Sequence, residues 1–150
     1  MLSGKSCLAP AKDDVYPGFE GTIAKVPGLP PLAEYSDPKY SRTDQLAVIA
    51  TQDAMANSGA DRSAFLDSGV VMASTLGGLT EIDTGIAKDP AAWYRRPDGL
   101  LRAASYPFAH VADVTGDHFG IRGPRCAVSV ACASGAVAIA LAANTLLDGA

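Results

Sequence analysis

The sequence predicts an α/β protein, in which helices alternate with short buried strands. Val70, Val71 and Met72 form an apolar run that is typical of a strand buried on both faces of a sheet. Residues 125–131 alternate valines with smaller side chains, which favours a second strand. Apolar residues at helical spacing precede the first of these strands and follow the second. This order of elements indicates a layered arrangement of helices on a sheet.

A long helix is predicted after an irregular first stretch of about forty residues, which prolines and glycines interrupt repeatedly. Ser41 or Thr43 can cap its N-terminus, and Gly59 ends it. Apolar residues at spacings of three and four predict the face that packs on the core. They are Leu46, Ile49, Ala50 and Ala54.

Shorter elements follow along the chain. Asp61 to Leu66 predicts a single helical turn, and Leu79 to Lys88 predicts a helix. Pro90 suits the first turn of another short helix. Proline has no backbone N–H, and an N–H in the first turn would have no acceptor within the helix. A helix from Phe108 to Phe119 ends at Gly120.

The last segment predicts a helix that begins after the second strand and stops at Asp148-Gly149. It is apolar nearly all round, which is typical of a helix buried inside a domain. Its large apolar residues are Val137, Ile139, Leu141, Leu146 and Leu147.

Composition narrows the classes of function. The 150 residues are 48% hydrophobic and 19% charged, which is enough apolar material for a globular core. The net charge of −4 argues against a nucleic-acid partner. Neither a membrane span nor a signal peptide is indicated, and an odd number of cysteines fits a reducing cytoplasm best, so we expect a cytoplasmic protein. The three cysteines lack the spacing of metal ligands, and no glycine run fits a nucleotide fingerprint, so no metal and no cofactor are predicted.

The most informative stretch is residues 123–135, Gly-Pro-Arg-Cys-Ala-Val-Ser-Val-Ala-Cys-Ala-Ser-Gly. It places Cys132 in a sharp turn between a strand and a helix. The positive end of a helix favours the thiolate, which is the nucleophilic form of cysteine. Cys132 is therefore a candidate for covalent catalysis. A buried core cysteine is the other interpretation, and the pattern alone leaves both open.

The same residues resemble a known family. Val130 to Gly135, preceded by Gly120 to Pro124, is similar to the active-site stretch of the β-ketoacyl-acyl carrier protein synthases. These are the condensing enzymes of fatty acid and polyketide synthesis, in the thiolase superfamily. Threonine is common in that family where this chain has Val130, but the cysteine is kept. Weaker similarity extends upstream, at Leu2 to Ser6, at Glu20 to Val26, and at Ser68 to Ser74 with Gly77-Gly78.

The resemblance implies a mechanism and a partner. Cys132 takes an acyl chain from the thioester of an acyl carrier protein, and its backbone N–H helps to form the oxyanion hole. A malonyl thioester then loses carbon dioxide, and the carbanion attacks the acyl-cysteine. The family's two catalytic histidines and its lysine come from the C-terminal half. Neither His110 nor His118 occupies a matching position, so a hydrogen-bonded or solvent-facing histidine is expected at both.

The resemblance also implies the fold. It is a thiolase-like arrangement of two similar halves, and this chain corresponds to the N-terminal half only, with αβα layers and a mixed, mainly parallel sheet. The family's first strand would precede Met1, and another strand would follow Ala150. We therefore expect residues 1–150 to form a partial domain, truncated at both ends, without condensing activity and with little stable structure alone. The strand Arg125 to Ala131 is expected to form a homodimer contact, as in the family.

These residues are compatible with two functions. The first is a condensing enzyme with Cys132 as acyl acceptor. The alternative is a non-catalytic module of the same fold, which acts by dimerisation or by binding the carrier protein. The length of the acyl chain, and the choice between fatty acid and polyketide pathways, are left open by these residues.

Overall fold

The computed structural model describes residues 8–10, 18, 20–24, 40–93, 95, 97 and 103–149. The chain divides into two units, Met1–Pro31 and Leu32–Ala150. In the first unit, strand β1 (Leu8–Pro10) pairs antiparallel with strand β2 (Thr22–Ala24). Strand β2 confirms the extended piece expected within Glu20 to Val26, while the similarity at Leu2 to Ser6 lies outside the described residues.

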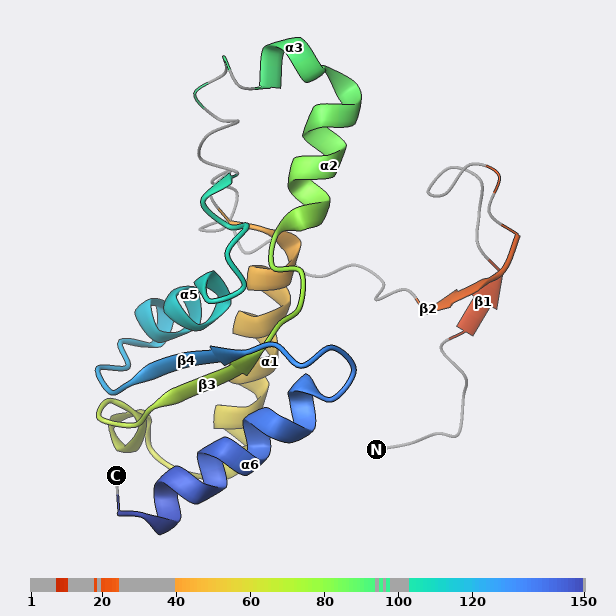
Figure 1. Ribbon diagram of the computed structural model, residues 1–150. Coiled ribbons are helices and arrows are strands. Elements are labelled where there is room, and N and C mark those ends of the chain that lie inside the picture. The colour runs from red at the N-terminus through yellow and green to blue at the C-terminus, as the bar shows by residue number, and fades with distance from the viewer. Residues whose placement is uncertain are drawn as a thin grey trace. The chain divides into compact units, whose positions relative to one another are not determined.

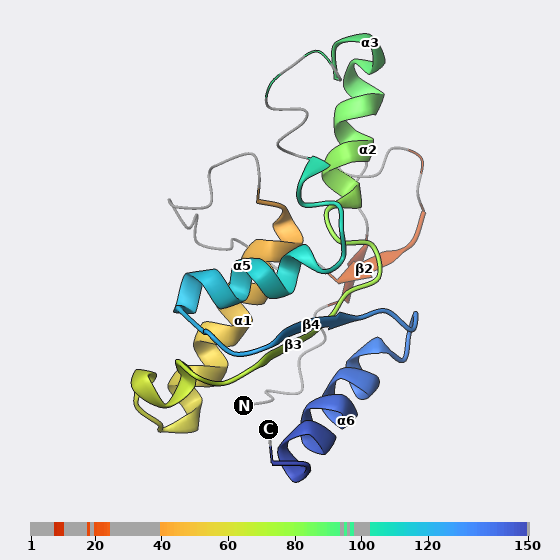
Figure 2. The same cartoon turned by 60° about the vertical axis from the view of Figure 1, so that its left-hand side comes forward.

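The second unit has three layers around a parallel pair of strands. Strand β3 (Val70–Ala73) lies beside strand β4 (Arg125–Val128), with Val70 opposite Arg125. Helices α1 (Arg42–Ser58) and α5 (His110–Phe119) lie on one face of this pair, and α6 (Ser134–Leu147) lies on the other (Figures 1 and 2). The predicted α/β class, parallel pairing and αβα layers are therefore confirmed.

The shorter elements lie where the sequence predicts them. A single 3-10 turn, η2 (Arg62–Phe65), precedes β3. Helix α2 (Leu79–Lys88) has the predicted bounds, and helix α3 (Pro90–Trp93) begins with its proline. Strand β3 is less buried than predicted, because only Val70 is fully buried while Val71 and Met72 are half-buried.

Helix α1 begins at a capping box. The hydroxyl of Ser41 accepts a hydrogen bond from the backbone N–H of Asp44 (3.1 Å), and the Asp44 carboxylate accepts one from the backbone N–H of Ser41 (2.7 Å). Two backbone donors that the helix leaves unpaired are thus satisfied. Ser41 is therefore the cap. Thr43, the other candidate, donates its hydroxyl to the carbonyl of Gly77 instead.

The predicted core face of α1 is wrong. Val48 and Asp44 are 0% and 1% exposed, whereas Leu46 is 38% exposed and Ala50 and Ala54 are also exposed. Hydrophobic periodicity counts Asp44 as a surface residue, but its hydrogen bonds allow its burial beside α5. Ala50 and Ala54 instead line a shallow hollow of about 350 Å³. Its lining residues are Ala47, Ala50, Thr51, Ala54, Met55, Phe65 and Met72.

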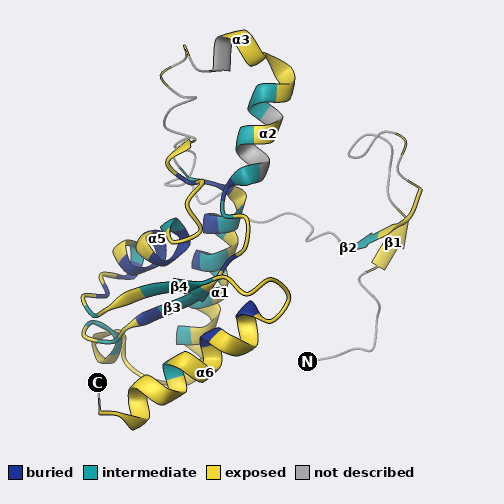
Figure 3. Cartoon of the chain, in the orientation of Figure 1, coloured by how far each residue is buried: buried dark blue, intermediate teal, exposed yellow. Residues whose placement is uncertain are grey.

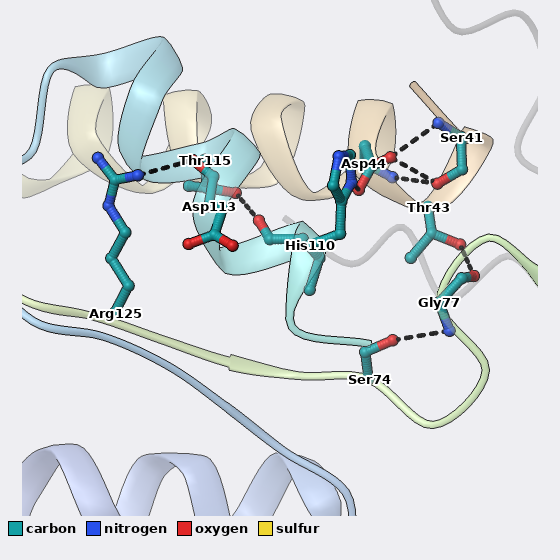
Figure 4. Close-up of polar contacts among 10 residues, drawn as sticks. Ser41, Thr43, Asp44, Ser74, Gly77, His110, Asp113, Thr115 and Arg125 are labelled. Atoms are coloured by element: carbon teal, nitrogen blue, oxygen red, sulfur yellow. Dashed lines mark hydrogen bonds and ion pairs between the residues drawn. The ribbon is translucent and has the colours of Figure 1, made fainter. Parts of the chain in front are cut away.

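His110 at the start of α5 pairs with Asp44 across the α1–α5 contact (Figure 4). Its Nδ1 lies 3.3 Å from Asp44 Oδ1, and the two side chains are 20% and 1% exposed. The hydrogen bond to Asp44 raises the pKa of His110, and the negative charges of Asp44, Asp113 and Asp117 add to it, outweighing the effect of burial. His110 is thus hydrogen-bonded, which is the default expected for it.

This pair predicts a loss of stability as the pH rises. In the folded state the pKa of His110 is raised above its ordinary value of 6.5, so the folded protein binds this proton more tightly than the unfolded chain does. The stabilisation is complete below about pH 6.5 and disappears as the pH rises through the folded-state pKa. We expect the stability difference between the native protein and His110→Gln to be larger at about pH 6 than at about pH 8.5 in urea titrations. A difference that is constant, or that grows with pH, would contradict this.

Helix α6 is far more exposed than predicted. Only Ser134 and Ala138 are buried along it, while Ile139 and Leu146 are each 74% exposed and Leu147 is 84% exposed (Figure 3). A helix on a pair of strands buries only the narrow side that touches them. No described element covers its other sides, so the predicted burial is wrong for this part of the chain.

The turn before β4 is tightly packed. Arg122 donates its backbone N–H to the carbonyl of Leu66 (2.7 Å), and Val70 donates its own to the carbonyl of Pro124 (2.8 Å). Between these bonds, a Cβ on Gly123 would collide with the backbone carbonyl of Ser68. Glycine at this position therefore lets the backbones leading into β3 and β4 approach each other.

Candidate functional site

The loop between β4 and α6, residues 129–133, lies at the end of the sheet where both parallel strands finish (Figure 2). The structure ends β4 at Val128, so the predicted strand Arg125 to Ala131 is three residues too long. The reason is that the backbone N–H of Val130 donates to the hydroxyl of Ser134 (2.7 Å), which turns the chain out of the sheet. The homodimer contact expected along this strand stays a prediction.

Four hydrogen bonds close this turn. The hydroxyl of Ser134 accepts from Val130 and donates to the carbonyl of Ala131 (2.8 Å). The backbone N–H of Ala133 donates to the carbonyl of Val130 (3.0 Å), and that of Ser134 donates to Ala131 (3.2 Å). Ala131 has φ +46°, in the left-handed region that non-glycine residues rarely occupy. Such a conformation persists only where neighbouring contacts hold it, and it is found often at functional sites.

Cys132 lies at the centre of this turn with its side chain exposed. Ala133 is the N-cap of α6 and Ser134 is its first residue, so Cys132 precedes the cap by one residue. The sharp turn predicted between strand and helix is confirmed, and among the described residues Cys132 is exposed, unlike a core cysteine. Cys126 is half-buried within β4, while Cys7 lies outside the described residues.

A second loop leaves the same end of the sheet after β3. Ser74 donates its backbone N–H to the carbonyl of Val128, and its hydroxyl accepts from the N–H of Gly77 (Figure 4). Gly78 in turn donates to the carbonyl of Ser105 (2.8 Å). A Cβ on Gly77 or Gly78 would collide with the Ser105–Tyr106 backbone or the Ser105 side chain, which explains the glycine pair. The glycine turn expected here is confirmed.

Arg125 connects β4 to α5. Its guanidinium donates to the carboxylate of Asp117 (2.6 Å) and to the carbonyl of Ile121 (2.9 Å). A Cβ on Gly116 would overlap the guanidinium, so the arginine lies directly against the helix. These contacts fix the strand that leads to Cys132.

Sequence reasoning missed two features of this region. The hydroxyl of Ser134 is a central element of the turn, and its only sequence signal is a serine two residues after the cysteine. The pairing of His110 with Asp44 joins residues 66 positions apart, which no local pattern reveals. His118 packs edge-on against Phe119, with ring centroids 4.6 Å apart.

Two further features are absent from the described part of the chain. No group of three or more His, Cys, Asp or Glu side chains there could hold a metal ion. Within the same part of the chain, no helix has both the length and the apolar character needed to cross a membrane.

Comparison with known proteins identifies the family. A family model described as beta-ketoacyl synthase, N-terminal domain, matches residues 7–150. A Streptomyces cyaneus protein named as a polyketide beta-ketoacyl synthase is 30% identical over 144 residues, which cover 88% of this chain and 34% of that protein. The solved ishigamide ketosynthase/chain length factor has a similar fold, with a TM-score of 0.66, 24% identity, and coverage of 95% of this chain and 41% of that one.

The chain thus spans about a third of the length of its curated relative. The structural likeness shows that the layered arrangement around β3 and β4 is the thiolase-like ketosynthase fold. The family match includes both the turn and its cysteine. The chain therefore belongs to the β-ketoacyl synthase family, in which residues 7–150 match the N-terminal domain.

Proposed function

We propose that this protein takes part in β-ketoacyl synthesis and that Cys132 is the residue which accepts the acyl chain. The observation that carries the proposal is the exposed thiol on a hydrogen-bonded turn, where the parallel strands end. Loops at the carboxyl ends of parallel strands are the usual place for α/β active sites. Membership of a family of condensing enzymes supports the same role.

Acyl transfer to Cys132 would proceed by addition to the thioester carbonyl and loss of the donor thiol. The thiolate sulfur of Cys132 attacks the carbonyl carbon of an acyl thioester, which gives a tetrahedral oxyanion. The oxyanion collapses, the bond from carbon to the donor sulfur breaks, and the donor leaves as a thiol with the proton that Cys132 gave up. We assign the backbone N–H of Cys132 as one donor to the oxyanion.

The wider reaction is decarboxylative condensation of this acyl chain with a malonyl thioester. An acyl carrier protein is the proposed donor of both thioesters. The likeness to a protein named as a polyketide beta-ketoacyl synthase supports the polyketide class of acyl chain over the fatty acid class. No described residue is assigned to the decarboxylation step.

Acyl transfer can be tested by mapping where the acyl group is retained. We expect the full-length protein, incubated with a short acyl thioester of an acyl carrier protein, to carry the acyl mass on the peptide that contains Cys132. The half-buried Cys126 should stay unmodified, because its thiol is in the strand and less accessible. Peptide mass mapping after brief exposure measures both sites.

Two results would contradict the proposal. Equal acylation of Cys126 and Cys132 would indicate ordinary thiol exchange. No acylation of Cys132, together with stable binding of the carrier protein, would support the alternative of a non-catalytic partner module.

A further inference from the structure

We propose that Ser134 is a positioning residue for the nucleophile, an inference that rests on the proposed acyl transfer to Cys132. Ser134 is 5% exposed and is the first residue of α6. Its hydroxyl reaches back across the turn, accepting from the N–H of Val130 at 2.7 Å and donating to the carbonyl of Ala131 at 2.8 Å. One side chain thus bridges two consecutive residues immediately before Cys132.

The two bonds act on the strained residue of the turn. Ala131 has φ +46°, and the hydroxyl contacts the residue before it as well as its own carbonyl. Without the hydroxyl, the carbonyl of Ala131 keeps its bond from the Ser134 backbone, but the N–H of Val130 loses the acceptor seen here. Ala131 is then free to relax toward the ordinary region of φ. Such a rotation redirects the next residue, which is Cys132.

Ser134 acts through geometry and does not exchange a proton with the substrate. Its own proton is donated to the carbonyl of Ala131, and its oxygen accepts from Val130. Loss of the hydroxyl should therefore lower the maximal rate of acylation and leave the half-saturating thioester concentration unchanged. A misplacement of a reacting group by about 1 Å lowers rates by up to roughly 100-fold, so we expect a fall of about 10- to 100-fold.

Ser41 supplies a matched control. It is 1% exposed and caps α1, and its hydroxyl also accepts from a backbone N–H and donates to an oxygen. Ser41→Ala thus removes a buried serine hydroxyl at the start of another helix. A general loss of stability should affect Ser41→Ala and Ser134→Ala alike, whereas a positioning effect is confined to Ser134.

The experiment measures the rate of acylation of Cys132 against thioester concentration in the full-length protein and its variants. We expect Ser134→Ala to lower the maximal rate, Ser134→Thr to restore it to within about threefold because the hydroxyl is kept, and Ser41→Ala to leave it unchanged. Unfolding in urea is measured for each variant. The inference is overturned if Ser134→Ala acylates at the native rate, if Ser41→Ala slows acylation equally, or if Ser134→Thr fails as Ser134→Ala does. Absence of acylation in the native protein instead overturns the proposed function.

Discussion

Replacing Cys132 with alanine should abolish acyl transfer to the protein. If the exposed thiol is the acyl acceptor, no neighbouring group can replace it, because the other described cysteine, Cys126, is half-buried in β4. Loss of a covalent nucleophile commonly lowers rates by roughly 10³-fold or more. We expect acyl retention from a thioester donor to fall to the background level, measured by intact mass over time.

The matched control is Cys126→Ala. This variant removes a thiol of the same chain from the strand that leads into the turn, and it should acylate at the native rate. Retention of the acyl group in Cys132→Ala, or its loss in Cys126→Ala, would assign the reaction to another residue.

Replacing Gly123 with alanine should cause a large loss of stability. The new Cβ would collide with the carbonyl of Ser68, which is backbone and cannot rotate away as a side chain can. The segments before β3 and β4 must then separate, which weakens the bonds from Val70 to Pro124 and from Arg122 to Leu66. We expect the free energy of unfolding to fall by about 3 kcal/mol in urea titrations.

Gly135→Ala is the corresponding control. Gly135 lies in the first turn of α6, and a Cβ there would meet nothing within 4 Å. Alanine is better than glycine within a helix by about 0.5–1 kcal/mol, so this variant should be slightly more stable than the native protein. A larger loss of stability in Gly135→Ala than in Gly123→Ala would show that crowding at Ser68 is not the determining contact.

Much of the fold could be predicted from local sequence because its signals are local. The cap at Ser41, the stop at Gly59 and the bounds of α2 depend on residues within one turn of each boundary. The turn at Cys132 was predictable for the same reason. The residue at which β4 ends could not be predicted, because it depends on the hydrogen bond from the backbone N–H of Val130 to the hydroxyl of Ser134.

The errors in burial have a different cause. Periodicity assumes that apolar residues face the core, but Asp44 is buried because Ser41 and His110 supply its hydrogen-bonding partners. The opposite error arises along α6, where leucines are exposed because the described layers cover only one side. Burial depends on which elements meet, and a pattern within one element does not contain that information.

The parallel pairing of β3 with β4 also sets apart the local and the long-range contacts that position the turn at Cys132. Residues 74–124 separate the two strands, whereas the capping box of α1 closes within four residues. Closing a flexible loop of about 50 residues costs roughly 3.5 kcal/mol in chain entropy, and contacts of such separation form slowly. The four hydrogen bonds of the turn at Cys132, by contrast, all lie within residues 130–134 and depend on no long loop. We therefore expect the turn to be able to form locally, whereas its placement at the end of the sheet requires β3 and β4 to pair.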